Sequence, residues 1–314
     1  MKKKLVAGAV TLLSVVTLAA CANGTNKDVV TMKGDTITVS DFYDEIKTNQ
    51  GAQQVLFQMT INKVFEKEYG SKVSDKEVDK ELAKQKKQLG NQFDAYLAQQ
   101  GLTEETAKKQ IRSNMLLEYA VSQAAKKDIK ESDYKTAFES YTPEVTAQII
   151  KLDSEDKAKE VLEAAKAEGA DFAKIAKDNS TDTATKDKGG EVKFDSGTAD
   201  IPSQVKEAAF KLDENGISDV ITVSAGQNYS ASYYIVKLNK KTEKGSDWKK
   251  YEKRLKEIIV DGRKQDTNFI RSVIAKAMTN ANIKVKDDAF KSTFNQYLQN
   301  IGVETSDSSS SSKK

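Results

Sequence analysis

The chain has 314 residues, of which 31% are charged and 38% are hydrophobic, so it is long enough for two or three domains with packed cores. It contains no histidine and a single cysteine, which excludes intramolecular disulfides, Ser-His-Asp triads, Cys-His dyads and nearly all zinc hydrolase sites. Without the three lysines at its start, 47 basic residues balance 47 acidic ones, and we expect no nucleic-acid-binding surface.

The first part of the chain has the layout of a signal peptide. Lysines precede an apolar run over 5–20, which is shorter than the roughly 20 residues of a membrane-spanning helix. The run ends in Leu-Ala-Ala-Cys, which resembles a bacterial lipobox. This resemblance implies transfer of a diacylglyceryl group to the Cys21 thiol, cleavage before Cys21 and acylation of the new amino terminus. We predict a signal peptide over 1–20, a lipidated tether over 21–28 and an anchor on the outer face of the cell membrane. An ordinary signal peptide and a stop-transfer helix are the less favoured alternatives.

The next segments predict a hairpin followed by helices. Residues 28–41 alternate apolar and polar around Lys-Gly-Asp, with Gly34 at the turn. Ser40 or Asp41 is expected to cap the following helix, and residues 41–140 are expected to be helical. Further helix starts are expected at Ser74, which has Glu77 three residues on, and at Thr103.

Pro143 ends the helical stretch, and the pattern changes after it. The elements expected beyond it are a strand at 145–152, helices at 154–168, 170–177 and 203–211, a polar loop at 178–198, strands at 219–224 and 231–238, helices over 246–279, a strand at 281–288 and a short helix to about Asn300. The apolar stripe over 251–277 is interpreted as core packing against residues 53–127, and a homodimer seam is the alternative left open.

This order predicts an α+β protein. Helical N- and C-terminal regions are expected to form one discontinuous chaperone domain around an inserted α+β unit. The predicted boundaries are 29–142 for the N-terminal region, 143–241 for the middle unit, 242–303 for the C-terminal region and 304–314 for a disordered tail.

The middle unit carries a set of motifs in a defined order. They are Ala170-Asp171-Phe172, Gly189-Gly190, Ala208-Ala209-Phe210-Lys211-Leu212 and Gly216-Ile217-Ser218. On these motifs the unit resembles the parvulin family of peptidyl-prolyl isomerases, and the plan of the whole chain resembles the PrsA-type foldase lipoproteins of Gram-positive bacteria. The resemblance implies a parvulin-like domain and a chaperone whose partners are unfolded or newly secreted proteins. No Gly-rich phosphate loop is present, and we expect neither a cofactor nor a metal.

The resemblance also assigns a degenerate catalytic site. Gln148 and Tyr234 stand where active parvulins have histidines, and Asp182 keeps the third polar position. Gln148 and Tyr234 can both donate and accept hydrogen bonds, so they are expected to form a neutral network around Asp182. The proline pocket is expected at Ile201, Val205 and Phe210, in which Val205 is a smaller wall than the family's phenylalanine.

An amide and a phenol do not reproduce the geometry of paired imidazoles, so isomerase activity is predicted to be weak or absent. Two alternatives stay open at this point. One is an active peptidyl-prolyl cis-trans isomerase with an altered site, and the more distant one is a solute-binding lipoprotein.

Overall fold

The structure, a computed structural model, describes residues 27–225 and 230–298. It is an α+β protein in which helices predominate, and the predicted fold class is confirmed. No helix within these ranges has both the length and the apolar composition that crossing a bilayer requires.

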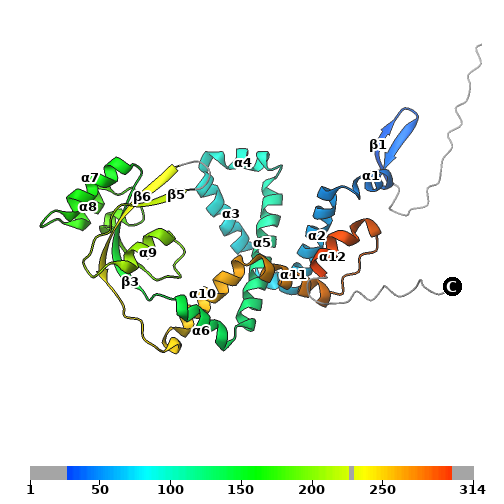
Figure 1. The fold of residues 1–314 in the computed structure, drawn as a ribbon. Helices are drawn as coiled ribbons and strands as arrows, with labels where there is room; N and C mark the ends of the chain where they lie inside the picture. The colour runs from blue at the N-terminus through cyan, green and yellow to red at the C-terminus, as the bar shows by residue number, and fades with distance from the viewer. Residues whose placement is uncertain (1–26, 226–229, 299–314) are drawn as a thin grey trace, which may run out of the picture. The chain divides into compact units, whose positions relative to one another are not determined.

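The described chain divides into two compact units. The first contains residues up to Val64 and from Ala275 onward, and the second spans Phe65–Ile274. The divisions fall inside two helices, α2 (Gln50–Tyr69) and α11 (Thr267–Asn280) (Figure 1). The described residues before Phe65 and after Ile274 thus belong to one unit, while the helices between these two positions group with the sheet. The predicted domain boundaries themselves stay a prediction.

The first unit begins with an isolated hairpin. Strands β1 (Asp28–Met32) and β2 (Asp35–Thr38) pair antiparallel, and Gly34 takes a φ of +88° at the turn between them. Helix α1 (Val39–Ile46) follows at once. Its N-cap is Thr38, not Ser40 or Asp41 as predicted. The Thr38 hydroxyl accepts a hydrogen bond from the backbone N–H of Asp41, whose carboxylate accepts one from the backbone N–H of Thr38, so the helix starts earlier than predicted.

The two chain ends of this unit are joined by side chains. The rings of Phe57 and Phe294 lie 5.3 Å apart, and Gln53 Nε2 donates to the Ala289 carbonyl at 2.9 Å. The strand predicted at 281–288 is wrong. Asn282 has a φ of +51° and the chain turns there, and no strand within the described residues pairs with this segment. The last elements of the unit are η6 (Asp288–Phe290) and α12 (Lys291–Leu298).

In the second unit a set of helices surrounds a core that includes the buried Leu116 and Leu255. The predicted capping box at Ser74 is confirmed, since its hydroxyl accepts from the Glu77 backbone N–H and Glu77 Oε2 accepts from the Ser74 backbone N–H at 2.7 Å. Thr103 likewise caps the longest of these helices. The helices are α3 (Asp75–Leu89), α4 (Phe93–Gln99), α5 (Glu104–Asp128), α6 (Glu131–Ser140) and α10 (Glu252–Gln265), with η1 (Gly70–Lys72), η2 (Gly90–Gln92) and η5 (Trp248–Tyr251) at their ends. Helix α10 packs on α5 and α6, which agrees with the interpretation of its apolar stripe as core packing.

The sheet of the second unit is antiparallel, with the order β4-β3-β6-β5. Helices α7 and α8 cover one face and α9 covers the other (Figure 1). Strand β3 therefore has buried residues on both faces, for example Ile149 and Ile150. The bounds are β3 (Val145–Leu152), α7 (Glu155–Lys166), α8 (Phe172–Asn179), η3 (Lys186–Lys188), β4 (Glu191–Phe194), α9 (Ser203–Lys211), β5 (Ile221–Ala225) and β6 (Ser230–Lys240).

Strand β4 corrects the predicted loop at 178–198. It is four residues long and pairs with the start of β3, so its hydrogen-bonding partner is more than forty positions away in sequence. The preceding Gly189 and Gly190 both have positive φ, and a Cβ on Gly190 would lie 2.5 Å from the Ile149 carbonyl oxygen. Only glycine allows the loop to approach β3 this closely.

Gly190→Ala should therefore destabilise the protein more than Gly169→Ala. Both glycines have positive φ, +78° and +74°, but a Cβ on Gly169 meets nothing within 4 Å. Gly169→Ala should cost about 1 kcal/mol of unfolding free energy from backbone strain. Gly190→Ala should cost about 1–3 kcal/mol more from overpacking against β3. Urea unfolding measures both, and equal losses would contradict the steric explanation.

Candidate functional site

Gln148 lies on β3, partly buried, and its amide is used within the fold. Its Nε2 donates to the carbonyl oxygen of Gly189 at 2.9 Å, and the neighbouring Ile149 backbone N–H donates to the Gly190 carbonyl at 2.8 Å. The amide therefore holds the glycine loop against the strand. This hydrogen bond accounts for a polar side chain at a position between apolar residues.

Tyr234 does not lie beside Gln148. In the β3–β6 ladder Ile150 pairs with Ile235 and Lys151 pairs with Tyr234. Side chains of paired residues share a face and alternate along each strand, so Gln148 is on the face of Ile150 and Tyr234 is on the opposite face. The packing agrees, because Ile150 belongs to the core under α7 and α8 while Tyr234 packs on the core under α9.

Asp182 makes local contacts in the loop after α8. Its carboxylate accepts hydrogen bonds from the Ala184 backbone N–H at 3.1 Å and from the Thr185 hydroxyl at 2.5 Å, and its own backbone N–H donates to Ser180 Oγ at 3.2 Å. These bonds close a turn. No hydrogen bond of the described chain joins Asp182 to Gln148 or Tyr234, so the structure does not bring the three predicted polar residues into one cluster.

The predicted pocket residues do share one side of the sheet. Val205 is fully buried in the core under α9, and Ile201 and Phe210 are partly buried against the same core. The Phe210 ring lies 5.8 Å from that of Phe194. Val205 therefore supports this surface from below, whereas Ile201 and Phe210 have surface that a ligand can reach. A proline-binding role for them stays a prediction.

A buried ion pair that the sequence did not suggest lies after β4. Asp195 is 6% exposed, and its carboxylate receives Nε and Nη2 of Arg254 at 2.6 and 2.9 Å. The hydroxyls of Tyr141 and Thr198 donate to the same carboxylate at 3.1 and 3.0 Å. The bidentate geometry ties the end of β4 to α10. Asp195 and Arg254 are 59 positions apart, so no local pattern signals the pair.

The ion pair changes the acid–base behaviour of its members. Burial alone would raise the pKa of the Asp195 carboxyl, but hydrogen bonds from Arg254 and Thr198 outweigh it, and the pKa lies below 3.8. Burial, together with the nearby Asp195, raises the pKa of the Tyr141 hydroxyl. Asp195 therefore stays ionised and Tyr141 stays a neutral donor at physiological pH.

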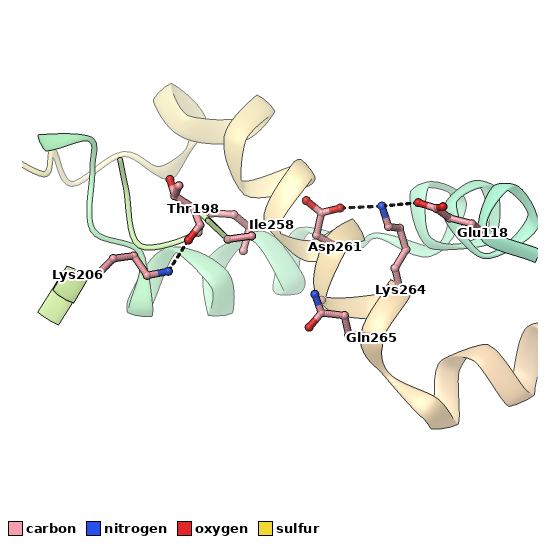
Figure 2. A pocket seen from close by; sticks show the side chains of 10 residues that line it. Glu118, Thr198, Lys206, Ile258, Asp261, Lys264 and Gln265 are labelled. Atoms are coloured by element: carbon pink, nitrogen blue, oxygen red, sulfur yellow. Dashed lines mark hydrogen bonds and ion pairs between the residues drawn. The ribbon is translucent and has the colours of Figure 1, made fainter. Parts of the chain in front are cut away.

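A cavity of about 600 Å³ adjoins this ion pair, between the loop after β4 and helix α10 (Figure 2). Ile258 offers an apolar wall, and the lysines at the rim are engaged. Lys206 Nζ donates to the Thr198 carbonyl at 2.6 Å, and Lys264 Nζ lies 3.1 Å from Asp261 and 3.2 Å from Glu118. In the described chain no three histidine, cysteine or acidic side chains are placed to hold a metal ion.

The chain is similar to a known protein family in sequence and in structure. The sequence model of the family described as "Rotamase: PPIC-type PPIASE domain" matches residues 102–240. The protein named Foldase protein PrsA of Streptococcus sanguinis is 62% identical over 302 residues, covering 96% of this chain and 90% of its own length. The protein of the same name from Streptococcus gordonii is 60% identical over 315 residues, covering 100% of both chains. The crystal structure of foldase protein PrsA from Streptococcus pneumoniae matches with a TM-score of 0.80 at 54% identity, covering 86% of this chain and 99% of that one.

Asp195→Asn should lower the free energy of unfolding at neutral pH by about 2–3 kcal/mol. Breaking a fully buried ion pair costs more, but the Arg254 side chain is one-third exposed, so solvent screens part of the interaction. The pKa of the Asp195 carboxyl is lower in the folded state than in the unfolded state, where it is about 4. The ion pair therefore contributes its full stabilisation above about pH 4, and this stabilisation is lost as the pH falls through the folded-state pKa. The variant should therefore lose less stability than the parent on acidification.

Urea unfolding at pH 7 and at several values down to pH 3, followed by the fluorescence of Trp248, measures both effects. Asp200→Asn is the matched control, because Asp200 is exposed in the same loop. Equal behaviour of the two variants would show that the Asp195 ion pair contributes nothing to stability.

Proposed function

Since the chain belongs to the PrsA family of foldase proteins, we propose that it is a membrane-anchored foldase whose helical regions chaperone exported proteins and whose parvulin-like domain has weak or no isomerase activity. The identity over nearly the full length to proteins named Foldase protein PrsA carries this proposal. A foldase acts on other proteins, so substrate proteins are its partners.

The helical regions supply apolar surface for unfolded chains. Val55 and Met59 on α2 are 59% and 52% exposed and are one helical turn apart, so they form one apolar strip. Exposed apolar groups of this kind bind unfolded segments without nucleotide, because burial of apolar surface drives the contact. The apolar stripe of α10 is used differently: its packing on α5 favours the core interpretation over a homodimer seam.

The geometry of the sheet supports weak isomerase activity. The barrier to rotation about a prolyl bond is about 18–20 kcal/mol, and lowering it requires polar groups that converge on the twisted bond. Gln148 and Tyr234 point to opposite faces, and Asp182 closes a turn. Each of these polar groups has a structural role, and together they do not form a convergent set.

An active prolyl isomerase is the second candidate, favoured by the match to the PPIC-type domain. Its surface would be Ile201, Phe210 and Tyr234, which lie over one core. A solute-binding lipoprotein fits poorly, because the sheets of the described residues are one hairpin and one four-stranded antiparallel sheet, not two α/β lobes.

The anchor is proposed from Cys21, the only cysteine, at the end of the apolar leader. Transfer of a diacylglyceryl group to its thiol and acylation of the new amino terminus would give two or more chains, which anchor stably where one alone is marginal. The proposed location is the outer face of the cell membrane. Both Cys21 and the leader lie outside the described residues.

Proline isomer exchange measured by NMR on a prolyl peptide should stay at the uncatalysed time of tens to hundreds of seconds when the purified protein is added, because Gln148, Tyr234 and Asp182 do not converge on one site. The same preparation should suppress aggregation of an unfolded client. Asp182→Ala should change neither result.

The matched variant for the chaperone activity is Met59→Ser, which removes exposed apolar surface and should weaken suppression of aggregation while leaving exchange unchanged. Faster exchange that Asp182→Ala abolishes would instead establish the isomerase.

Cys21→Ser should move the full chain from the membrane fraction to the soluble fraction of a bacterium that processes lipoproteins, because the acyl chains are the proposed anchor. Mass spectrometry of the Cys21 peptide reports the modification directly. Asn23→Ser, a change in the tether, should leave the protein in the membrane fraction. Retention of Cys21→Ser in that fraction would contradict the lipid anchor.

A further inference from the structure

The hairpin and the first helix expose an unusual amount of apolar surface. Six large apolar side chains there are between 39% and 53% exposed. We call this group the hairpin surface; its residues are Val29, Val30, Met32, Ile37, Val39 and Phe42. Soluble surfaces tolerate scattered apolar residues, but a group this dense marks a site of contact.

The hairpin surface has little support from the rest of the chain. All five residues of β1 are exposed, and α1 has no buried residue. Its ties include the Tyr43 hydroxyl, which donates to Asp287 Oδ2 at 2.7 Å, and the Val39 backbone N–H, which donates to the Lys27 carbonyl at 2.8 Å. A two-stranded hairpin and an eight-residue helix are each marginal in water, so an external surface that covers them would complete their packing.

The position of the anchor identifies that surface. Only residues 22–27 separate Cys21 from the first residue of β1. A fully extended stretch of this length reaches at most about 25 Å. An acylated Cys21 would therefore keep the hairpin surface next to the bilayer. Resting on the lipid anchor proposed above, we propose that the hairpin surface binds the lipid surface of the membrane and lies in its interface.

The charges around the hairpin surface define the kind of contact. The segment 28–47 carries two basic residues, Lys33 and Lys47, and five acidic ones, which are Asp28, Asp35, Asp41, Asp44 and Glu45. Two copies of this surface would bring like charges together, which disfavours a second copy as the occupant. Attraction to anionic headgroups is absent for the same reason. The contact is apolar and should persist in zwitterionic vesicles and at high salt.

A tryptophan placed at Phe42 tests the contact. The full chain carrying Trp248→Phe and Phe42→Trp is produced in a host that processes lipoproteins and reconstituted in phosphatidylcholine vesicles containing brominated lipid. Its emission should be quenched, and more by bromine near the headgroup end of the acyl chain than near the terminal methyl, because interfacial segments lie about 5–10 Å deep. Val30→Trp in the same background is a second reporter.

The matched control is Tyr96→Trp in the same background. Tyr96 on α4 is an aromatic side chain of similar exposure, 45% against 53% for Phe42, but it belongs to the second unit. Its replacement should not be quenched. Equal quenching at both sites would indicate nonspecific adsorption and overturn the inference.

The remaining outcomes separate the inference from the proposed anchor. An acylated chain whose tryptophans at 42 and 30 are not quenched overturns the hairpin contact and leaves the anchor intact. Absence of lipid on Cys21 overturns both. A blue shift of the emission in solution that grows with protein concentration would assign the surface to a second copy. A blue shift that requires an unfolded client would assign it to client binding, and either shift would also overturn the inference.

Discussion

The second unit depends on side-chain contacts made by three of the chain's four arginines, two of which form bidentate ion pairs. Arg112 holds Glu66 at 2.9 and 2.8 Å and thereby ties α2 to α5. Arg254 holds Asp195 and ties the sheet to α10, and Arg263 donates to the Ala125 carbonyl and to Asp133. Lysine supplies nearly all the other positive charge. The contacts that fix one element against another are nevertheless made by arginine, because its planar guanidinium presents several donors in a fixed arrangement.

The polar residues predicted to form the catalytic site of this domain make structural contacts instead. Gln148 holds the glycine loop, Asp182 closes a turn, and Tyr234 covers the core under α9. The sheet is thus a rigid platform with an apolar side at Ile201 and Phe210. Under the proposed function, this side of the sheet would bind a client without accelerating isomerisation, since binding ground state and transition state equally well does not raise the rate of the chemical step.

The apolar surface that is left uncovered is distributed unevenly. Among the described residues, nine of the ten exposed large hydrophobic side chains fall between Val29 and Met59, and the tenth is Tyr96. The second unit, by contrast, buries its apolar residues in cores on both faces of the sheet. Most of the exposed apolar side chains of the described residues therefore lie in the first unit. We propose the client as the partner of Val55 and Met59, and the lipid surface as the partner of the hairpin surface.

The sequence alone determined what depends on neighbours along the chain: the α+β order, the hairpin turn at Gly34 and the helix starts at Ser74 and Thr103, because capping and periodicity are local. The order of the parvulin motifs carried the resemblance to the family. Only the tertiary structure decided that Gln148 and Tyr234 face apart, that β4 forms within the predicted loop at 178–198, and that residues 281–288 make no strand. Strand pairing and ion pairs such as that of Asp195 join residues tens of positions apart, so their register and partners are set by packing and leave no local signal.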